Sequence, residues 1–213
     1  MDTITPDPQA ALCEARQSFL LSLADALRDL AASRCIMHHA ARVLGERLAC
    51  GRVRYVDLDR EQVTFAASAE WTNAALGIEP VEDRFSLSQL NPEMIAAVQQ
   101  GGVLQVDDVR DDPRTRSQAE LYLNFRVAAG LVVPLTKDGL LTAALSVHHP
   151  EPRVWATDEL ELVQDVAERT WSAVQQARAE AELKRTKAEL QLALDVAGMG
   201  HWQLVCPLKS GPS

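Results

Sequence analysis

Two apolar runs separated by a tight turn constrain the fold of this chain more than any other feature. Residues 128–135 and 140–147 are almost entirely apolar, and Thr136-Lys137-Asp138-Gly139 lies between them. An Asp-Gly pair between two such runs favours a β-hairpin, so we predict a hairpin over residues 128–152. Both arms are apolar on both faces, which is typical of strands in the centre of a sheet with helices over at least one side.

Length and charge exclude several classes of protein. The 213 residues suffice for one domain with helical flanks. A net charge of −9 disfavours nucleic acid and anionic membranes as partners, because phosphate binding needs clustered Lys and Arg. No apolar run approaches the roughly 18 residues of a membrane span, and the first residues carry acids where a secretory signal has basic residues. We therefore expect a cytoplasmic protein.

The cysteines do not indicate a metal or redox site. Cys13, Cys35, Cys50 and Cys206 are widely spaced, with no C-x-x-C pair and no His at zinc-finger spacing. We expect ordinary core or surface thiols and no metal.

Two helices are predicted before the first strand. Over residues 8–30, four leucines recur at three- and four-residue steps: Leu20, Leu23, Leu27 and Leu30. This helix either packs on its own domain or forms half of a subunit interface. Ser33 is a candidate cap for a second helix over residues 34–48, and Gly51 suits the left-handed residue that follows a helix.

The middle of the chain alternates short strands and helices. Strands are predicted over residues 52–58 and 63–71, joined by a turn at 59–62, and a short strand over 85–87. Asn91 before Pro92 is a good start for a helix that Gly101-Gly102 ends. A strand over 103–109 and a short helix over 117–125 lead into the central hairpin.

A long helix is predicted from Thr157, a candidate cap, to about residue 197. It has no Gly or Pro before residue 198, which suggests a signalling or dimerising rod and a parallel dimer. Charged residues dominate beyond Glu180, as expected where a helix projects from its domain. The predicted signalling and dimer seam of this helix comprises Leu160, Val163, Ala167, Thr170, Val174, Ala177 and Ala181.

Three stretches in this order resemble GAF domains of bacterial signalling proteins: VLQVDDVRDDPRT, GLVVPLTKDGLLTAALSVHHPEPRVWATDE and LVQDVAERTWSAV. The resemblance covers residues 19–178. It implies an α+β fold with a six-stranded antiparallel sheet flanked by helices, here with long N- and C-terminal helices.

The resemblance also implies a domain organisation. Residues 1–18 would form a tail and the start of a helix, 19–178 the GAF sensor domain, and 179–194 a signalling helix. ALDVAGMGHWQL is similar to the opening of a PAS domain in sensor histidine kinases, so residues 195–213 would be a truncated PAS start or a disordered tail. The final LKSGPS is interpreted as a cloning remnant or disordered tail, and the full-length protein is expected to carry PAS and kinase domains.

GAF ligands lie between one sheet face and the loops and helices over it, which implies a candidate binding site here. Apolar walls are expected from Trp71, Phe85, Leu90, Met94, Tyr122, Phe125, Val132 and Leu145, and polar anchors from Asp107, Asp108, Arg110 and His148. Alternatively, the aromatic residues are plain core, the Asp pair caps a turn, and the histidine is buried with a backbone partner.

This chain lacks the residues that mark the better-known ligand-binding and catalytic functions of the GAF family. The segment SQAELYLNFR has neither the Cys nor the His that attaches a bilin, so we expect no covalent bilin. No His lies between Asp107 and Val147 for a haem, and Asn124-Phe125-Arg126 lacks the Lys and acidic pair of cyclic-nucleotide members. Cys35 and Cys50 fall outside the pocket where free methionine sulfoxide reductases pair their cysteines. The cofactor is thus left unknown, and no enzymatic activity is expected.

The resemblance therefore predicts a non-enzymatic sensory GAF domain of a two-component-type protein, which senses an unknown small molecule and relays it through the C-terminal helix. One alternative is a ligand-free dimerisation or scaffold domain. A second alternative is a sensor with a non-covalently bound chromophore or haem.

Overall fold

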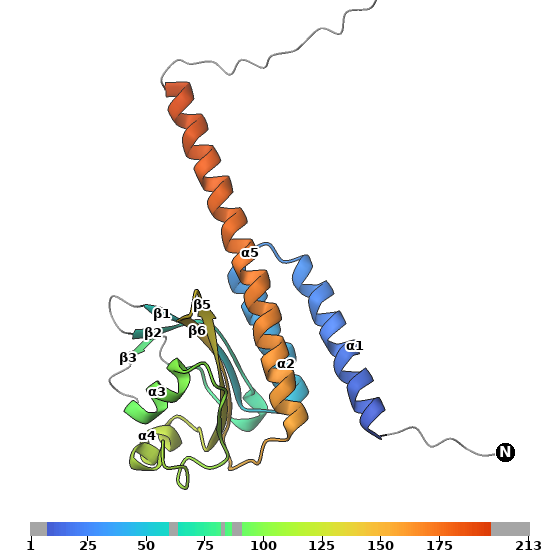
Figure 1. Cartoon of the computed structure of the whole chain (residues 1–213), viewed down its shortest axis with the longest axis vertical. Helices are drawn as coiled ribbons and strands as arrows, with labels where there is room; N and C mark the ends of the chain where they lie inside the picture. The colour runs from blue at the N-terminus through green and yellow to red at the C-terminus, as the bar shows by residue number, and fades with distance from the viewer. Residues whose placement is uncertain (1–7, 60–63, 82–83, 87–90, 197–213) are drawn as a thin grey trace, which may run out of the picture.

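The computed structural model describes residues 8–59, 64–81, 84–86 and 91–196, in which one antiparallel sheet separates two layers of helices (Figure 1). Its six strands follow the order β3-β2-β1-β6-β5-β4. The strands are β1 Arg52–Asp59, β2 Thr64–Thr72, β3 Arg84–Ser86, β4 Leu104–Val106, β5 Ala129–Lys137 and β6 Leu140–His149. Because β3 and β4 have three residues each, most of the sheet is β2-β1-β6-β5. The predicted antiparallel sheet flanked by helices is confirmed.

The central hairpin forms as predicted. Strands β5 and β6 pair from Ala129 opposite His149 to Lys137 opposite Leu140. Asp138 and Gly139, with φ of 53° and 74°, form the two-residue turn, and positive φ at both positions is what this kind of hairpin turn requires. β6 lies between β1 and β5, so the apolar runs occupy the middle of the sheet.

Three helices cover one face of the sheet: α1 Pro8–Arg28, α2 Ser33–Leu48 and α5 Thr157–Val196. Helices α2 and α5 pack on the sheet, and α1 lies outside them (Figure 1). The inward residues of β1, β5 and β6 join these helices in the main hydrophobic core, which includes Val53, Leu131 and Leu145. Two ion pairs, from Arg16 to Glu161 and to Asp165, connect α1 to α5.

Most of the predicted dimer seam belongs to this core. Val163, Ala167, Thr170 and Val174 have no exposed surface, because they face the domain's own sheet and helices. The predicted leucine stripe is likewise buried in the core at Leu20, Leu23 and Leu27 of α1 and half-buried at Leu30, two residues after α1. Leu160 and Ala177 are half-buried, and of the predicted seam only Ala181 is exposed. The α1 helix thus packs on its own domain, and the buried positions are corrected from interface to core.

Three predicted helix ends differ from the structure. Ser33 lies inside α2, whose cap is Ala32 without a side-chain hydrogen bond. The left-handed residue after α2 is Ala49, with φ of 48°, and not Gly51. Thr157 is the first residue of α5, where the Glu159 carboxylate accepts the N–H of Ala156 instead.

The other face of the sheet carries α3 Pro92–Gln99 and α4 Ala119–Asn124 (Figure 1). Asn91 caps α3 as predicted, since its side chain accepts the N–H of Glu93. Short 3₁₀ helices span Ala74–Leu76, after β2, and Arg116–Gln118, directly before α4. The layer is thin, and its loops and helices leave a cavity against the sheet.

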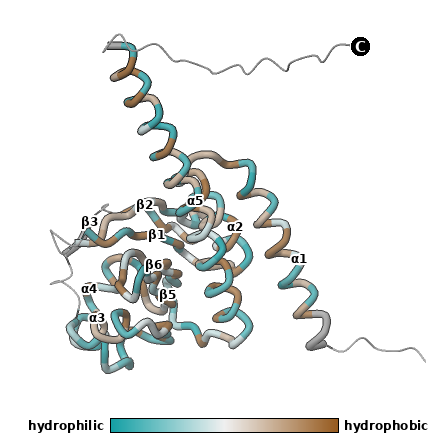
Figure 2. The backbone as a smooth tube through the Cα atoms, turned by 45° about the horizontal axis from the view of Figure 1, so that its top comes forward, coloured by the Kyte–Doolittle hydropathy of each residue, from teal (hydrophilic) through white to brown (hydrophobic). Residues whose placement is uncertain are grey.

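Helix α5 continues without a break for 40 residues, well beyond the domain. Residues 179–193 are all exposed, and hydrophobic and hydrophilic positions alternate along this projecting half (Figure 2). Leu183 and Leu190, seven residues apart, are 57% and 60% exposed. Within the described ranges, no helix is both long and apolar enough to cross a bilayer.

Candidate functional site

A cavity of about 300 Å³ lies between the sheet and the layer of α3, β4 and α4. Its floor is the sheet face opposite the helical core. Because side chains alternate along a strand, every second residue of three strands faces the cavity: Arg52, Arg54 and Val56 of β1, Ala144, Ser146 and His148 of β6, and Gly130 and Val132 of β5. The volume is at the lower end of small-molecule sites, which span about 300–1,000 Å³.

The walls of the cavity are largely apolar. Helix α3 contributes Met94, Ile95 and Val98, and β4 contributes Leu104 and Val106. The α4 region adds Leu121, Tyr122 and Phe125, of which Leu121 and Phe125 are 39% and 47% exposed at the outer side. The Tyr122 hydroxyl lies 3.4 Å from the Met94 sulfur, and burial raises the pKa of this tyrosine. Such a lining suits the apolar body of an organic molecule.

One end of the floor holds a buried cluster of charges. Oε1 of Glu70 lies 3.0 Å from Nε of Arg52 and 3.4 Å from Nε of Arg54, and the three side chains are 12%, 3% and 8% exposed. Arg52 also donates to the carbonyl oxygens of Phe125 (3.1 Å) and Glu79 (2.9 Å). Burial lowers the pKa of Arg52, while Glu70 opposes the shift. Arg52 thus ties the sheet to two loops at the edge of the cavity.

His148 lines the cavity beside this cluster. Burial, together with the charges of Arg52 and Arg54, lowers its pKa to about 3, so its imidazole is neutral at physiological pH. Its Nδ1 is buried and has no hydrogen-bond partner within the described residues. The ring lies against Gly130, where an added Cβ would be 3.2 Å from Cδ2 of His148 and 3.0 Å from the carbonyl oxygen of Val147. Glycine at position 130 therefore leaves the room that this ring occupies.

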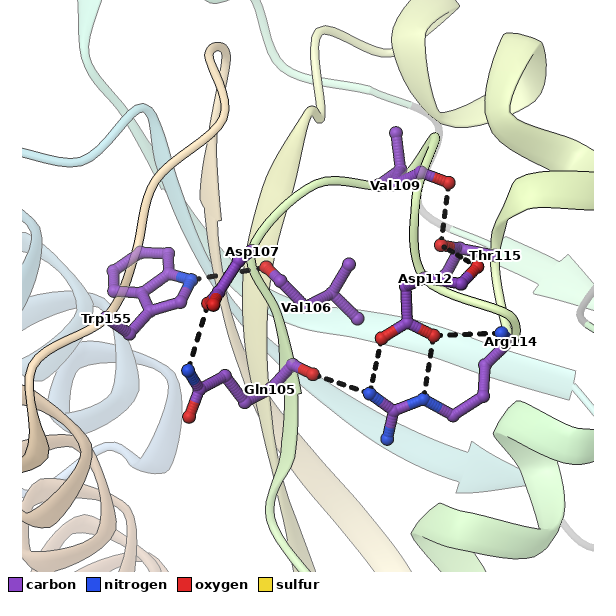
Figure 3. A network of polar contacts seen from close by, with 8 residues as sticks. All are labelled: Gln105, Val106, Asp107, Val109, Asp112, Arg114, Thr115 and Trp155. Carbon is purple, nitrogen blue, oxygen red and sulfur yellow. Dashed lines mark hydrogen bonds and ion pairs between the residues drawn. The ribbon is translucent and has the colours of Figure 1, made fainter.

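A network of polar contacts holds the loop after β4 (Figure 3). Arg114 forms an ion pair with Asp112 and donates to the carbonyl oxygen of Gln105 at 2.7 Å. The Thr115 hydroxyl donates to the carbonyl oxygen of Val109 at 2.8 Å. Hydrogen bonds from Arg114 lower the pKa of Asp112. Because Val109 and Thr115 line the cavity, this network fixes one of its walls.

Five of the predicted site residues line the cavity: Met94, Tyr122, Phe125, Val132 and His148. Two others fall where the structure is not described: Leu90 lies outside the described residues, and of Phe85, on β3, only the backbone is described.

The remaining predicted residues lie elsewhere. Leu145 lies between Ala144 and Ser146 on β6 and therefore faces the opposite side of the sheet, where it packs in the helical core. Asp107 accepts a hydrogen bond from Gln105 at 2.9 Å and does not line the cavity. Asp108 and Arg110 pair with each other at 2.7 Å on the surface, where hydrogen bonds from Arg110 lower the pKa of Asp108. The Asp108 carboxylate also accepts the backbone N–H of Arg110 and so stabilises the turn.

Trp71 also lies on the helical side of the sheet. It packs against α2 at Gly45, where an added Cβ would be 2.1 Å from Cζ3 of the indole. Arg52, Arg54 and Ser146 also line the cavity, although they were not among the predicted site residues. Alternation in RVRYVDL places Arg52 and Arg54 on one face, and that signal was available in the sequence.

No group of His, Cys, Asp and Glu side chains within the described residues is arranged to hold a metal ion. Cys50 is buried, and burial raises the pKa of its thiol to about 12. Cys13 and Cys35 are exposed on the helical side.

Comparison with known proteins identifies a family. A family model described as GAF domain matches residues 17–174. An uncharacterized protein of Picosynechococcus is 33% identical over 69 residues, which are 32% of this chain and 43% of that protein. The chain therefore matches less than half of the length of this curated relative.

Solved structures share the fold at low identity. The phycoerythrobilin-bound GAF domain of a cyanobacterial phytochrome superposes with a TM-score of 0.68 and 18% identity, covering 78% of this chain and 97% of that one. The blue-light absorbing form of the Thermosynechococcus elongatus PixJ GAF domain gives 0.60 and 23%, over 75% and 92%. Free methionine-R-sulfoxide reductase from Neisseria meningitidis, solved with its substrate, gives 0.63 and 16%, over 84% and 98%.

Proposed function

Because the chain belongs to the GAF domain family, we propose that it is a non-enzymatic sensory domain of a bacterial two-component signalling protein in the cytoplasm. A small molecule binds in the cavity between the sheet and α3, β4 and α4. Helix α5 relays this binding to PAS and kinase domains of the full-length protein.

The observation that carries this proposal is the position of β1 between the cavity and α5. Arg52, Arg54 and Val56 face the cavity, while Tyr55, between them, is buried on the helical side. Burial raises the pKa of Tyr55, and the nearby Thr170 hydroxyl of α5 partly opposes this shift. Neither hydroxyl completes a well-aligned hydrogen bond within the described part of the chain, so close packing in the core joins β1 to α5 at this point.

A second contact joins the end of β1 to α5. Arg178 donates to Asp57 at 2.7 Å, and the Ser68 hydroxyl of β2 donates to the same carboxylate. Arg178 also lies 5.9 Å from the ring centroid of Trp171. Arg178 directly precedes residues 179–193, which are all exposed. A movement of β1 on ligand binding would therefore be transmitted to α5 at the point where the helix leaves the domain. Such coupling requires that the ligand bind one arrangement of these contacts better than another.

Native mass spectrometry on the freshly purified chain tests the binding step. We expect one extra small-molecule mass per subunit, and a higher melting temperature when the released compound is added back. Ala144→Phe, which fills the cavity floor, should abolish both effects. Ala188→Phe, the same change on the exposed part of α5, should leave them intact. Equal behaviour of the two folded variants would rule out the cavity as the binding site.

Hydrogen exchange along α5 tests the relay. The compound should change exchange over residues 179–196 in the original chain but not in Asp57→Asn, which weakens the pair with Arg178 and still binds. Glu189→Gln, which weakens the exposed Arg185–Glu189 pair, is the matched control and should retain the change. An Asp57→Asn variant with an unaltered response would contradict this route.

A ligand-free dimerisation or scaffold domain is the second candidate. It is favoured by the exposed leucines Leu183 and Leu190, seven residues apart on one side of the projecting half of α5, which can pair with a second parallel copy. Leu183→Glu with Leu190→Glu should then convert a dimer to a monomer in light scattering, without lowering the melting temperature of the domain. A dimer with no bound compound, whose cavity variants behave normally, would favour this candidate.

A non-covalently bound chromophore or haem is the third candidate. Its support is the fold shared with phycoerythrobilin-bound and blue-light absorbing GAF domains. Visible absorbance that co-purifies with the protein and is lost after denaturation would support it, and a colourless protein with a bound mass would not.

A further inference from the structure

We propose that the cavity takes an uncharged ligand of one or two rings, whose hydrogen-bonding group meets the His148 imidazole and the Ser146 hydroxyl. This inference rests on the proposed small-molecule function and names the chemical class of the ligand.

The charged groups of the cavity are already engaged with protein atoms. Nε of Arg52 faces Glu70, and its two terminal nitrogens donate to the carbonyl oxygens of Phe125 and Glu79. Arg54 pairs with the same Glu70 carboxylate. An anion entering this space would lose its hydration and take these donors from existing partners, which disfavours it. A cation would meet two buried guanidinium groups.

Nε of Arg52 and Nε of Arg54 form ion pairs with Glu70 but no aligned hydrogen bond among the residues that the structure describes. Two polar groups of the cavity have no ion-pair partner in this part of the chain, and both are neutral. The hydroxyl of Ser146 makes no hydrogen bond within the described residues, although this residue is only 8% exposed. Nδ1 of His148 is buried without a partner in the same part of the chain, and the imidazole is uncharged at physiological pH. The two residues are two apart on β6, which places them side by side on the floor about 7 Å apart. Buried polar groups without partners are rare, and a ligand that hydrogen-bonds to them would remove the penalty.

The rest of the cavity limits the size and polarity of the ligand. Val56, Val98, Val106 and Val132 surround these groups with apolar surface. A volume of about 300 Å³ suits one or two fused or linked rings better than a tetrapyrrole. The ligand therefore has an apolar body and few hydrogen-bonding atoms.

Two dyes that share a ring system test this inference. 2-Naphthol, a fluorescent compound of two fused rings and one hydroxyl, is uncharged at neutral pH, and 2-naphthol-6-sulfonate differs from it by one sulfonate. In fluorescence titrations of the full chain, we expect the uncharged dye to bind about tenfold or more tightly, because a buried sulfonate loses its hydration and has to displace the carbonyl partners of Arg52. His148→Phe keeps a ring but removes both nitrogens, and it should weaken the uncharged dye about threefold to tenfold.

Variants locate the bound dye and separate the outcomes. Ala144→Phe should abolish binding of the uncharged dye, and Ala188→Phe should not; Ser146→Leu replaces the first variant if it fails to fold. Equal or tighter sulfonate binding that Ala144→Phe abolishes would overturn the uncharged class but keep small-molecule binding. Dye binding that no folded cavity variant alters, or no binding at all, would overturn both the inference and the binding step of the proposed function.

Discussion

Substitution of Gly45 by alanine tests the packing of the indole of Trp71 on α2. In a helix interior this change ordinarily stabilises by about 1 kcal/mol, because glycine has the higher conformational entropy in the unfolded chain. Here the new methyl group would lie 2.1 Å and 2.2 Å from Cζ3 and Cε3 of Trp71. Carbon atoms pack at about 3.5–4.0 Å, so the ring would have to retreat by about 1.4 Å or more.

The displacement opposes the gain in helix propensity. Forcing extra volume into a packed interior costs about 1–3 kcal/mol, and Gly45 is buried between Trp71 and the core of α2. We therefore expect Gly45→Ala to lower the free energy of unfolding by up to about 2 kcal/mol, after the propensity gain is subtracted. Urea unfolding followed by circular dichroism measures this quantity.

The same substitution in a variant without the indole shows whether the clash causes the destabilisation. In Trp71→Leu, which removes the ring atoms that clash, the same Gly45→Ala change should stabilise by up to about 1 kcal/mol. The effect of the methyl group should thus reverse with the residue at position 71. Stabilisation in the original chain, or equal destabilisation in both backgrounds, would refute the close contact between α2 and the indole.

Three further predictions concern the cavity. Glu70→Gln should destabilise the domain by about 3 kcal/mol, because it leaves buried guanidinium groups without their carboxylate, whereas Glu46→Gln in an exposed pair should change the unfolding free energy by less than about 0.5 kcal/mol; equal effects in urea unfolding would contradict the buried cluster. The pKa of His148 falls from 6.5 to about 3 on folding. Between these two pH values the imidazole is protonated in the unfolded chain and neutral in the folded chain. This histidine should remove up to about 1.4 kcal/mol of stability per pH unit as pH falls through that window, and a His148→Gln variant with the same pH profile would contradict it. Thr115→Val should lower the free energy of unfolding by about 1–2 kcal/mol, because the carbonyl of Val109 loses its donor, while Thr115→Ser should lower it less; identical values in thermal melts would argue against this bond.

The sequence was sufficient to predict the sheet and most of its elements because their signals are local. The Asp138-Gly139 pair, the cap at Asn91 and the unbroken period of α5 each depend on a few neighbouring residues. The helix ends were less predictable, since Ala49 takes a left-handed conformation with no side chain that favours it.

The site was predicted only in part because its geometry depends on register and on contacts between distant segments. Leu145 and Ser146 are adjacent in sequence, and only the pairing of β6 with β1 and β5 decides which of them faces the cavity. The apolar stripe of α5 had two possible partners, its own sheet or a second copy, and periodicity does not distinguish them. The structure shows Val163 and Val174 against the sheet.

Because α5 is unbroken, its projecting half can move as a rigid rod that pivots where the helix packs on the sheet. Residues 179–196 extend beyond Arg178 by about 27 Å, at the usual rise of 1.5 Å per residue. A tilt of about 5° at Thr170 and Arg178 would sweep the far tip through more than about 2 Å, because rigid-body geometry multiplies a small angle by the length of the arm. A tilt of α5 that is too small to disturb the core can therefore move the far end of the helix enough to change which side chains it contacts.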